Sequence, residues 1–137
     1  MMKSQTMSIL LIEDNPDHVF LTRQAVHTAW RDVSLFVTCN LDEVRTIRHS
    51  PCAPARFDLI LAALDMRDPH RLAHLREMQA SGEINDAPII ALVGSTREQE
   101  LARVAHQPKE WIILKPLRAE SLREAIRRRP LPRPAPR

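Results

Sequence analysis

The chain has 137 residues, of which 44% are hydrophobic and 27% charged, as in a single soluble globular domain. No apolar run is long enough for a membrane span or a signal peptide. Tyrosine is absent and aromatic residues make up only 4%, which argues against an aromatic stacking surface for bases or sugars. The two cysteines, Cys39 and Cys52, lack metal-ligand spacing and fit a reducing compartment, so we expect a cytoplasmic protein.

The net charge of +3 comes from the C-terminal part of the chain. The range Leu117–Arg137 holds seven Arg and two Glu, and without it the chain would be slightly acidic. Residues 130–137 are rich in Pro and Arg, which predicts a disordered tail. Binding of an anionic partner, a nucleic acid or an acidic lipid surface, is one hypothesis for this segment. A solubilising tail is the simpler interpretation, and we do not expect a nucleic-acid ligand. The arginines concerned are Arg127, Arg128, Arg129, Arg133 and Arg137.

Apolar runs between capping and breaking residues predict five strands that alternate with five helices. Asn15 and Pro16 suit the N-cap and first position of the first helix, and Gly82 the end of the third. The expected strands are Ser8–Ile12, Val33–Cys39, Leu59–Leu64, Ile89–Val93 and Trp111–Leu114. The expected helices are Pro16–Trp30, Leu41–His49, Pro69–Ser81, a fourth capped by Ser95 or Thr96 with Leu101 and Val104 inward, and Glu120–Arg128.

The third strand is apolar throughout, which is typical of a strand buried on both faces of a parallel sheet. We therefore expect an α/β fold: a doubly wound five-stranded parallel sheet in the flavodoxin-like order 2-1-3-4-5, packed as a three-layer sandwich. In this fold the ligand crevice lies at the carboxyl ends of strands one and three. The residues that this brings together are Glu13, Asp14, Ala63 and Asp65. Paired carboxylates there suit Mg²⁺, or they are only the solvated acidic start of a helix.

Four motifs, in order, resemble the CheY-like receiver domains of response regulators in two-component signalling. They are Ile9–Asp17, Asp58–Leu61, Ala87–Leu92 and Ile113–Pro116. The resemblance covers about residues 7–128, and we expect a receiver domain over 7–129 followed by a tail at 130–137. The Glu-Asp-Asn-Pro-x-Asp form of the first motif is similar to stand-alone receivers that accompany phytochrome-type histidine kinases.

In this family an aspartate at the end of strand three accepts a phosphoryl group from a histidine kinase. Mg²⁺, a lysine and a Thr or Ser hydroxyl stabilise the transferred group. The resemblance places Asp14 and Glu13 at the metal-binding carboxylates and Lys115 at the lysine. It places Ala63 at the phosphoacceptor, and a methyl side chain cannot form an acyl phosphate.

Three further positions lack the family's usual residue types. Val93 stands at the hydroxyl position and Ile112 at the position of the switch aromatic, while Arg67 replaces the usual proline. These losses agree with one another, so we expect a degenerate receiver, not an enzyme, that acts by protein–protein contact. Its Mg²⁺ site, formed by Glu13, Asp14 and Asp65, would be weak or lost.

Asp65 is the alternative phosphoacceptor, in a Mg²⁺-dependent reaction. It lies two residues beyond Ala63, roughly 6–7 Å along an extended chain. That displacement would spoil in-line geometry, since about 1 Å already matters for such a reaction. We expect Lys115 to pair with Asp14 or Asp65, and the resemblance implies a cis Lys115–Pro116 bond.

The resemblance implies a bacterial, single-domain response regulator whose partner is a sensor histidine kinase or another signalling protein. We also expect a homodimer through helix four, strand five and helix five. Trp111 is either an interface anchor or a packing residue. The expected interface residues are Arg97, Glu100, Arg103, Trp111, Arg118 and Arg123. His70 and His74 stand four apart without a third ligand, which favours solvated residues over a metal site.

Overall fold

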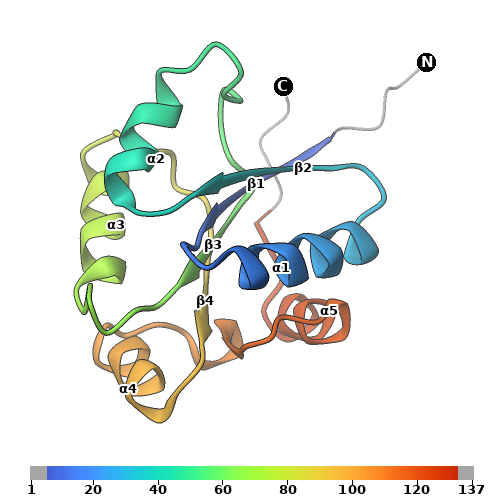
Figure 1. Ribbon diagram of the computed structural model, residues 1–137, viewed down its shortest axis with the longest axis vertical. Helices are drawn as coiled ribbons and strands as arrows, with labels where there is room; N and C mark the ends of the chain where they lie inside the picture. The colour runs from blue at the N-terminus through green and yellow to red at the C-terminus, as the bar shows by residue number, and fades with distance from the viewer. Residues whose placement is uncertain (1–5, 133–137) are drawn as a thin grey trace.

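The structure, a computed structural model, describes residues 6–132 (Figure 1). The strands are β1 (Met7–Ile12), β2 (Val33–Thr38), β3 (Leu59–Ala63), β4 (Ile89–Val93) and β5 (Ile112–Leu114). The helices are α1 (Pro16–Ala29), α2 (Leu41–Arg48), α3 (Arg71–Ala80), α4 (Thr96–Val104) and α5 (Ala119–Arg128), with a 3₁₀ turn at Lys109–Trp111. Most of the predicted tail, 133–137, lies outside the described residues.

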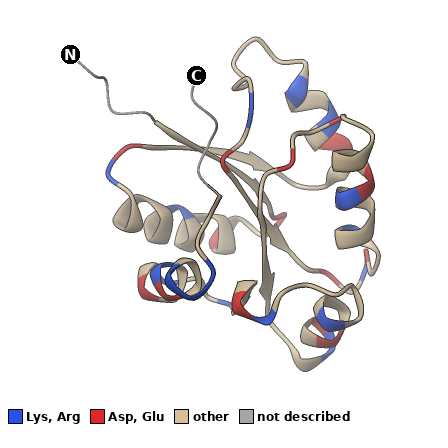
Figure 2. Ribbon diagram, turned by 180° about the vertical axis from the view of Figure 1, so that it is seen from behind, with Lys and Arg blue, Asp and Glu red and all other residues tan. Residues whose placement is uncertain are grey.

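The five strands form one parallel sheet in the order β2-β1-β3-β4-β5, which confirms the predicted fold class. Helices α1 and α5 cover one face, and α2, α3 and α4 cover the other (Figure 1). Figure 2 shows that the charged residues gather on the helices and at strand ends, while the middle of the sheet is almost free of them. No helix within residues 6–132 is long and apolar enough to cross a membrane.

The central strand β3 supplies side chains to both cores. Those of Leu59, Leu61 and Ala63 pack toward α1 and α5. Those of Ile60 and Ala62 pack toward the other three helices. Complete burial of a Leu or Ile contributes about 1.5–3 kcal/mol, so this strand and its neighbours fix the sheet. Their carboxyl ends are held in register, because Ala63 pairs with Leu92 of β4.

The capping predictions at three helix ends are confirmed. The Asn15 side chain accepts hydrogen bonds from the N–H groups of Asp17 and His18 at the start of α1. Ser95 caps α4 by accepting from the N–H of Glu98. Gly82 follows α3 with a positive φ of 82°, the conformation that glycine adopts without steric cost. The Lys115–Pro116 bond is cis, as the resemblance implied.

The structure corrects two helix predictions. Helix α3 begins at Arg71 instead of Pro69, because the chain first makes a turn in which Asp65 O accepts from the N–H of Asp68. Val104 was expected to face inward but is 68% exposed. Helix α4 instead packs through Leu101, Ala102 and Ala105, which share one face of the helix, and Val104 lies off that face.

Candidate functional site

The candidate site lies where β1 and β3 end, as the sequence predicted for this fold. Glu13 and Asp14 follow β1, and Ala63 is the last residue of β3. The Ala63 side chain is only 1% exposed and packs in the apolar core with Leu61 and Leu92. The position at which the resemblance places the phosphoacceptor therefore presents a methyl group and no oxygen nucleophile.

Arg67, in the loop after β3, joins two of the predicted metal carboxylates. Its Nε lies 2.9 and 3.0 Å from the two carboxylate oxygens of Asp65. Its Nη2 contacts carboxylate oxygens of both Asp14 and Asp65. The rigid guanidinium fork suits such a bridge, since it offers several N–H donors in one plane. Arg67 thus supplies positive charge at the place where the resemblance implied Mg²⁺.

The same contacts lower the pKa of Asp65 from 3.8 to about 2, chiefly through the side-chain hydrogen bond from Arg67. A carboxylate whose pKa falls on folding adds stability above pH 4, and this is lost as the pH drops toward 2. Arg67 is mostly exposed, so solvent screens the pair and the contribution to stability is small.

This makes a prediction for the titration of Asp65. In Arg67→Met the Asp65 pKa should return toward 3.8, because the hydrogen bonds that favour the charged form are gone. Carbon-13 NMR of the carboxyl group measures this directly in both proteins. An unchanged midpoint in the variant would show that Arg67 does not hold Asp65 in solution.

Lys115 pairs with Glu13, which corrects the expected pairing with Asp14 or Asp65. Its Nζ lies 3.3 Å from Glu13 Oε1, and both side chains are largely buried. Glu13 Oε2 also accepts from the N–H of Asn15 at 3.3 Å. His18 Nδ1 lies 3.3 Å from Glu13 Oε1 without making a hydrogen bond. The strand-end lysine therefore compensates a buried carboxylate of its own chain.

Val93 and Ile112 are apolar packing residues. Val93 is fully buried at the end of β4, and Ile112 opens β5 and is partly buried. Both belong to the core that includes Ala102 of α4. These two side chains, at the positions that the resemblance assigns to the hydroxyl and the switch aromatic, thus pack in the core with α4 and offer no hydrogen-bond donor.

Arg71 fixes the loop that carries Arg67. Its guanidinium is buried, with the residue only 6% exposed. Nη1 donates to the backbone oxygen of Ala63 at 2.6 Å, and Nε donates to the Asp68 carboxylate at 3.1 Å. The loop between β3 and α3 is therefore tied to the end of β3 by an internal arginine.

The Glu98 side chain accepts a hydrogen bond from the backbone N–H of Gly94, the residue that follows β4. Its Oε1 accepts from the N–H of Gly94 at 2.7 Å. Gly94 lies beside the side chains of Glu98 and Lys115. A Cβ atom at Gly94 would be 3.6 Å from Glu98 Oε1 and 3.8 Å from Lys115 Cδ. This donor already has an acceptor within the chain.

The predicted interface residues do not all point outward. Trp111 is buried, and its Nε1 donates to Arg129 O at 3.0 Å, so its ring packs inside the protein. Arg123 reaches Thr28 O of α1 at 2.9 Å. Arg103 pairs with Glu100 on the surface of α4. Arg97 and Arg118 are exposed, and the face also exposes Val104 and Leu114.

Three of the C-terminal arginines lie within the described residues. Arg127 and Arg128 both bind Glu124, and Arg129 stacks over Trp111 at 5.1 Å. Arg133 and Arg137 lie outside the described residues. The His70 and His74 rings are 6.1 Å apart. No three His, Cys, Asp or Glu side chains within residues 6–132 form a group that could hold a metal.

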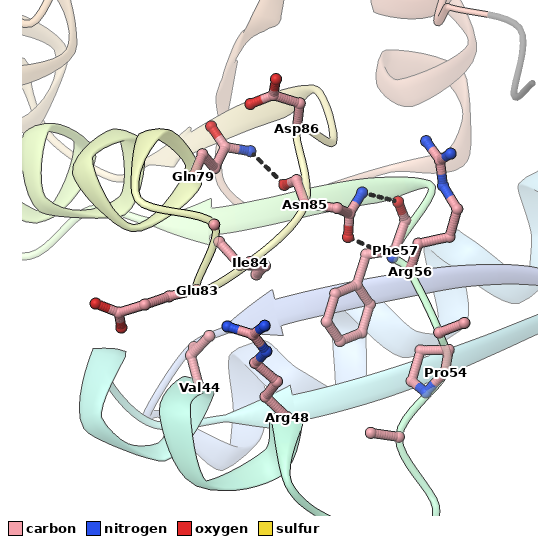
Figure 3. A pocket seen from close by; sticks show the side chains of 13 residues that line it. Val44, Arg48, Pro54, Arg56, Phe57, Gln79, Glu83, Ile84, Asn85 and Asp86 are labelled. Atoms are coloured by element: carbon pink, nitrogen blue, oxygen red, sulfur yellow. Dashed lines mark hydrogen bonds between the residues drawn. The ribbon is translucent and has the colours of Figure 1, made fainter.

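A pocket of about 360 Å³ lies at the opposite end of the sheet from the candidate site (Figure 3). Phe57, Val44 and Ile84 line it, with Arg48 and Arg56 among its polar residues. Hydrogen bonds in both directions between the Asn85 side chain and the Phe57 backbone close one wall. Its lining holds no paired nucleophile and base, and it lies away from the strand ends at which the resemblance places the receiver site.

The sequence did not predict the contacts that Arg67, Arg71 and Glu98 make in the site. Arg67 stood out only as the replacement of a proline. The spacing of Asp68 and Arg71, three residues apart at a helix start, could have suggested their ion pair. Ser95 and Glu98 have the spacing of a capping box, which could have placed the Glu98 side chain.

No family model matches the chain, and no curated protein matches its sequence. The bacteriophytochrome response regulator AtBRR superposes with a TM-score of 0.74 and 20% identity, covering 96% of this chain and 97% of that chain. The bacteriophytochrome response regulator RtBRR superposes with a TM-score of 0.73 and 17% identity, covering 96% of this chain and 82% of that chain.

A third similar structure contains a bound magnesium ion. The receiver domain of sensor histidine kinase PA1611 from Pseudomonas aeruginosa PAO1 has a magnesium ion coordinated in its active site cleft. It superposes with a TM-score of 0.63 and 22% identity, covering 90% of this chain and 96% of that chain. With its parallel sheet in the order 2-1-3-4-5, the chain therefore has the fold of response-regulator receiver domains.

Proposed function

We propose that the chain is a degenerate receiver that works in a bacterial two-component pathway by protein–protein contact, without aspartyl phosphorylation and without enzymatic activity. The observation that carries the proposal is the buried methyl group of Ala63 at the end of β3. Phosphoryl transfer to a receiver needs a carboxylate oxygen there, and no rearrangement of the loop supplies one at this residue.

The rest of the site supports the same proposal. Asp65, the alternative acceptor, is bonded to Arg67 through both carboxylate oxygens. Val93 offers no hydroxyl, and Lys115 is engaged by Glu13. A carboxylate held by a guanidinium has its lone pairs committed to hydrogen bonds, which leaves it a poor nucleophile.

The partner in this proposal is a sensor histidine kinase or another signalling protein of the cytoplasm. The described residues 7–129 form the receiver unit of this proposal. For self-association we place the contact on α4, β5 and α5, where β5 is the edge strand of the sheet. Val104 of α4 and Leu114 of β5 are exposed apolar residues, and α4 and α5 also carry exposed charged residues. Apolar residues within a polar rim suit a protein interface.

Sedimentation velocity over a range of concentrations tests this contact. We expect a dimer that Val104→Glu weakens by about tenfold or more, because a charge would be buried at its centre. Phe20→Glu is the matched control, since Phe20 is a similarly exposed apolar residue on α1. Acetyl phosphate with Mg²⁺ should leave the dimer unchanged. Equal effects of both substitutions, or a dimer that forms only with acetyl phosphate, would refute the proposal.

A further inference from the structure

The fold implies a divalent cation at the end of β1 and β3, and the residues present can be tested for it. Mg²⁺ in proteins takes one or two carboxylates, and its remaining ligands are oxygens of water, phosphate or backbone carbonyls in octahedral geometry. The candidate carboxylates are Glu13, Asp14 and Asp65. They do not form a cluster that could hold a metal in the described part of the chain.

Each of these carboxylates already has a cation of the same chain. Glu13 is buried against Lys115. Asp14 and Asp65 share the guanidinium of Arg67, which approaches Asp65 through two nitrogen atoms. Oxygens of all three carboxylates that Mg²⁺ would need are therefore engaged in ion pairs or hydrogen bonds.

The backbone of the loop is engaged as well. Asp65 O accepts from the N–H of Asp68 at 2.9 Å, and Ala63 O accepts from Arg71 at 2.6 Å. The N–H of Arg67 itself donates to Asp65 Oδ1 at 2.9 Å, which fixes the start of its side chain close to the carboxylates. Arg67 thus reaches Asp14 from a loop whose conformation is set by internal bonds.

We propose that Arg67 is the built-in cation of this site and excludes Mg²⁺ and other divalent cations from Asp14 and Asp65. The inference deepens the proposed function, and it rests on that function only in taking the site to receive no phosphoryl group. Mg²⁺ binds against the cost of dehydration, and here it would also have to displace a guanidinium from two carboxylates.

The test is a Mg²⁺ titration, without any phosphodonor, followed by the amide signals of Asp14 and Asp65 in proton–nitrogen NMR spectra. Native protein should show no saturable shift in millimolar Mg²⁺. In Arg67→Met both signals should shift and saturate, with affinity raised by about tenfold or more, because the guanidinium that competes for the two carboxylates is gone. Arg67 is 74% exposed, so the variant should keep its fold.

The matched control is Arg103→Met, which removes an equally exposed arginine that pairs with Glu100 away from the site. It should behave as native protein does. Saturable binding by native protein with the affinity of Arg67→Met would overturn the inference. A variant as unresponsive as native protein would overturn it too, because Arg67 would then not be what excludes the metal. Since no phosphodonor is present, neither result depends on whether the chain can be phosphorylated.

Discussion

Arg71→Ala should destabilise the protein by about 2–3 kcal/mol, a large part of the 5–15 kcal/mol typical of a whole domain. The Arg71 guanidinium is buried and donates to the backbone oxygen of Ala63 at 2.6 Å. Truncation withdraws that donor from a buried carbonyl, removes the partner of the Asp68 carboxylate and leaves a void beside β3.

Urea unfolding of the native and variant proteins measures this difference. The control is Arg103→Ala, because Arg103 pairs with Glu100 at the same three-residue spacing but is 76% exposed. Exposed pairs of this kind are worth little, so we expect a change below about 0.5 kcal/mol. Equal losses for the two variants would mean that burial of Arg71 does not stabilise the loop.

The fold was predictable because the strands are short buried runs and three of the helices begin at capping residues. Parallel strands buried on both faces leave few topologies, and the sheet order followed from the number of β–α units. The motifs also placed Ala63 and Asp14 at neighbouring strand ends, since each lies within two residues of the end of a predicted strand, and the structure ends β3 at Ala63.

The contacts within the site were not predictable in the same way. Arg67 is an exposed loop residue, and its partners depend on a loop conformation set by hydrogen bonds over several residues. Lys115 has a long flexible side chain within a site of several carboxylates, and sequence spacing does not tell which of them it meets. Lys115 pairs with the buried Glu13 because a nearby cation stabilises a buried carboxylate more than a solvated one.

The prediction that Val104 faces inward was wrong for a different reason. A three-residue spacing from Leu101 fits a helix face, but α4 ends at Val104 and its buried face is centred on Ala102. In so short a helix a few small residues decide which side packs, and a larger β-branched residue can remain exposed. The exposed Val104 became part of the proposed contact surface.

The largest effect concerns phosphorylation itself, since the expected outcome is complete absence of the product. Acyl phosphate formation needs a carboxylate at the end of β3, and Ala63 has none. In Ala63→Asp a carboxylate stands at the end of β3, but Arg67 still holds Asp14 and Asp65. We therefore expect Ala63→Asp to label weakly and the double variant with Arg67→Met to label better, provided circular dichroism confirms that both are folded.

The most direct test is the intact mass of native protein after incubation with acetyl phosphate and Mg²⁺, with an aspartate-bearing receiver domain as positive control. We predict that the control gains one phosphoryl group while the native chain keeps its mass. A native chain that gains one phosphoryl group would contradict phosphorylation-independent action. Loss of that label in Asp65→Asn would then identify Asp65 as the acceptor.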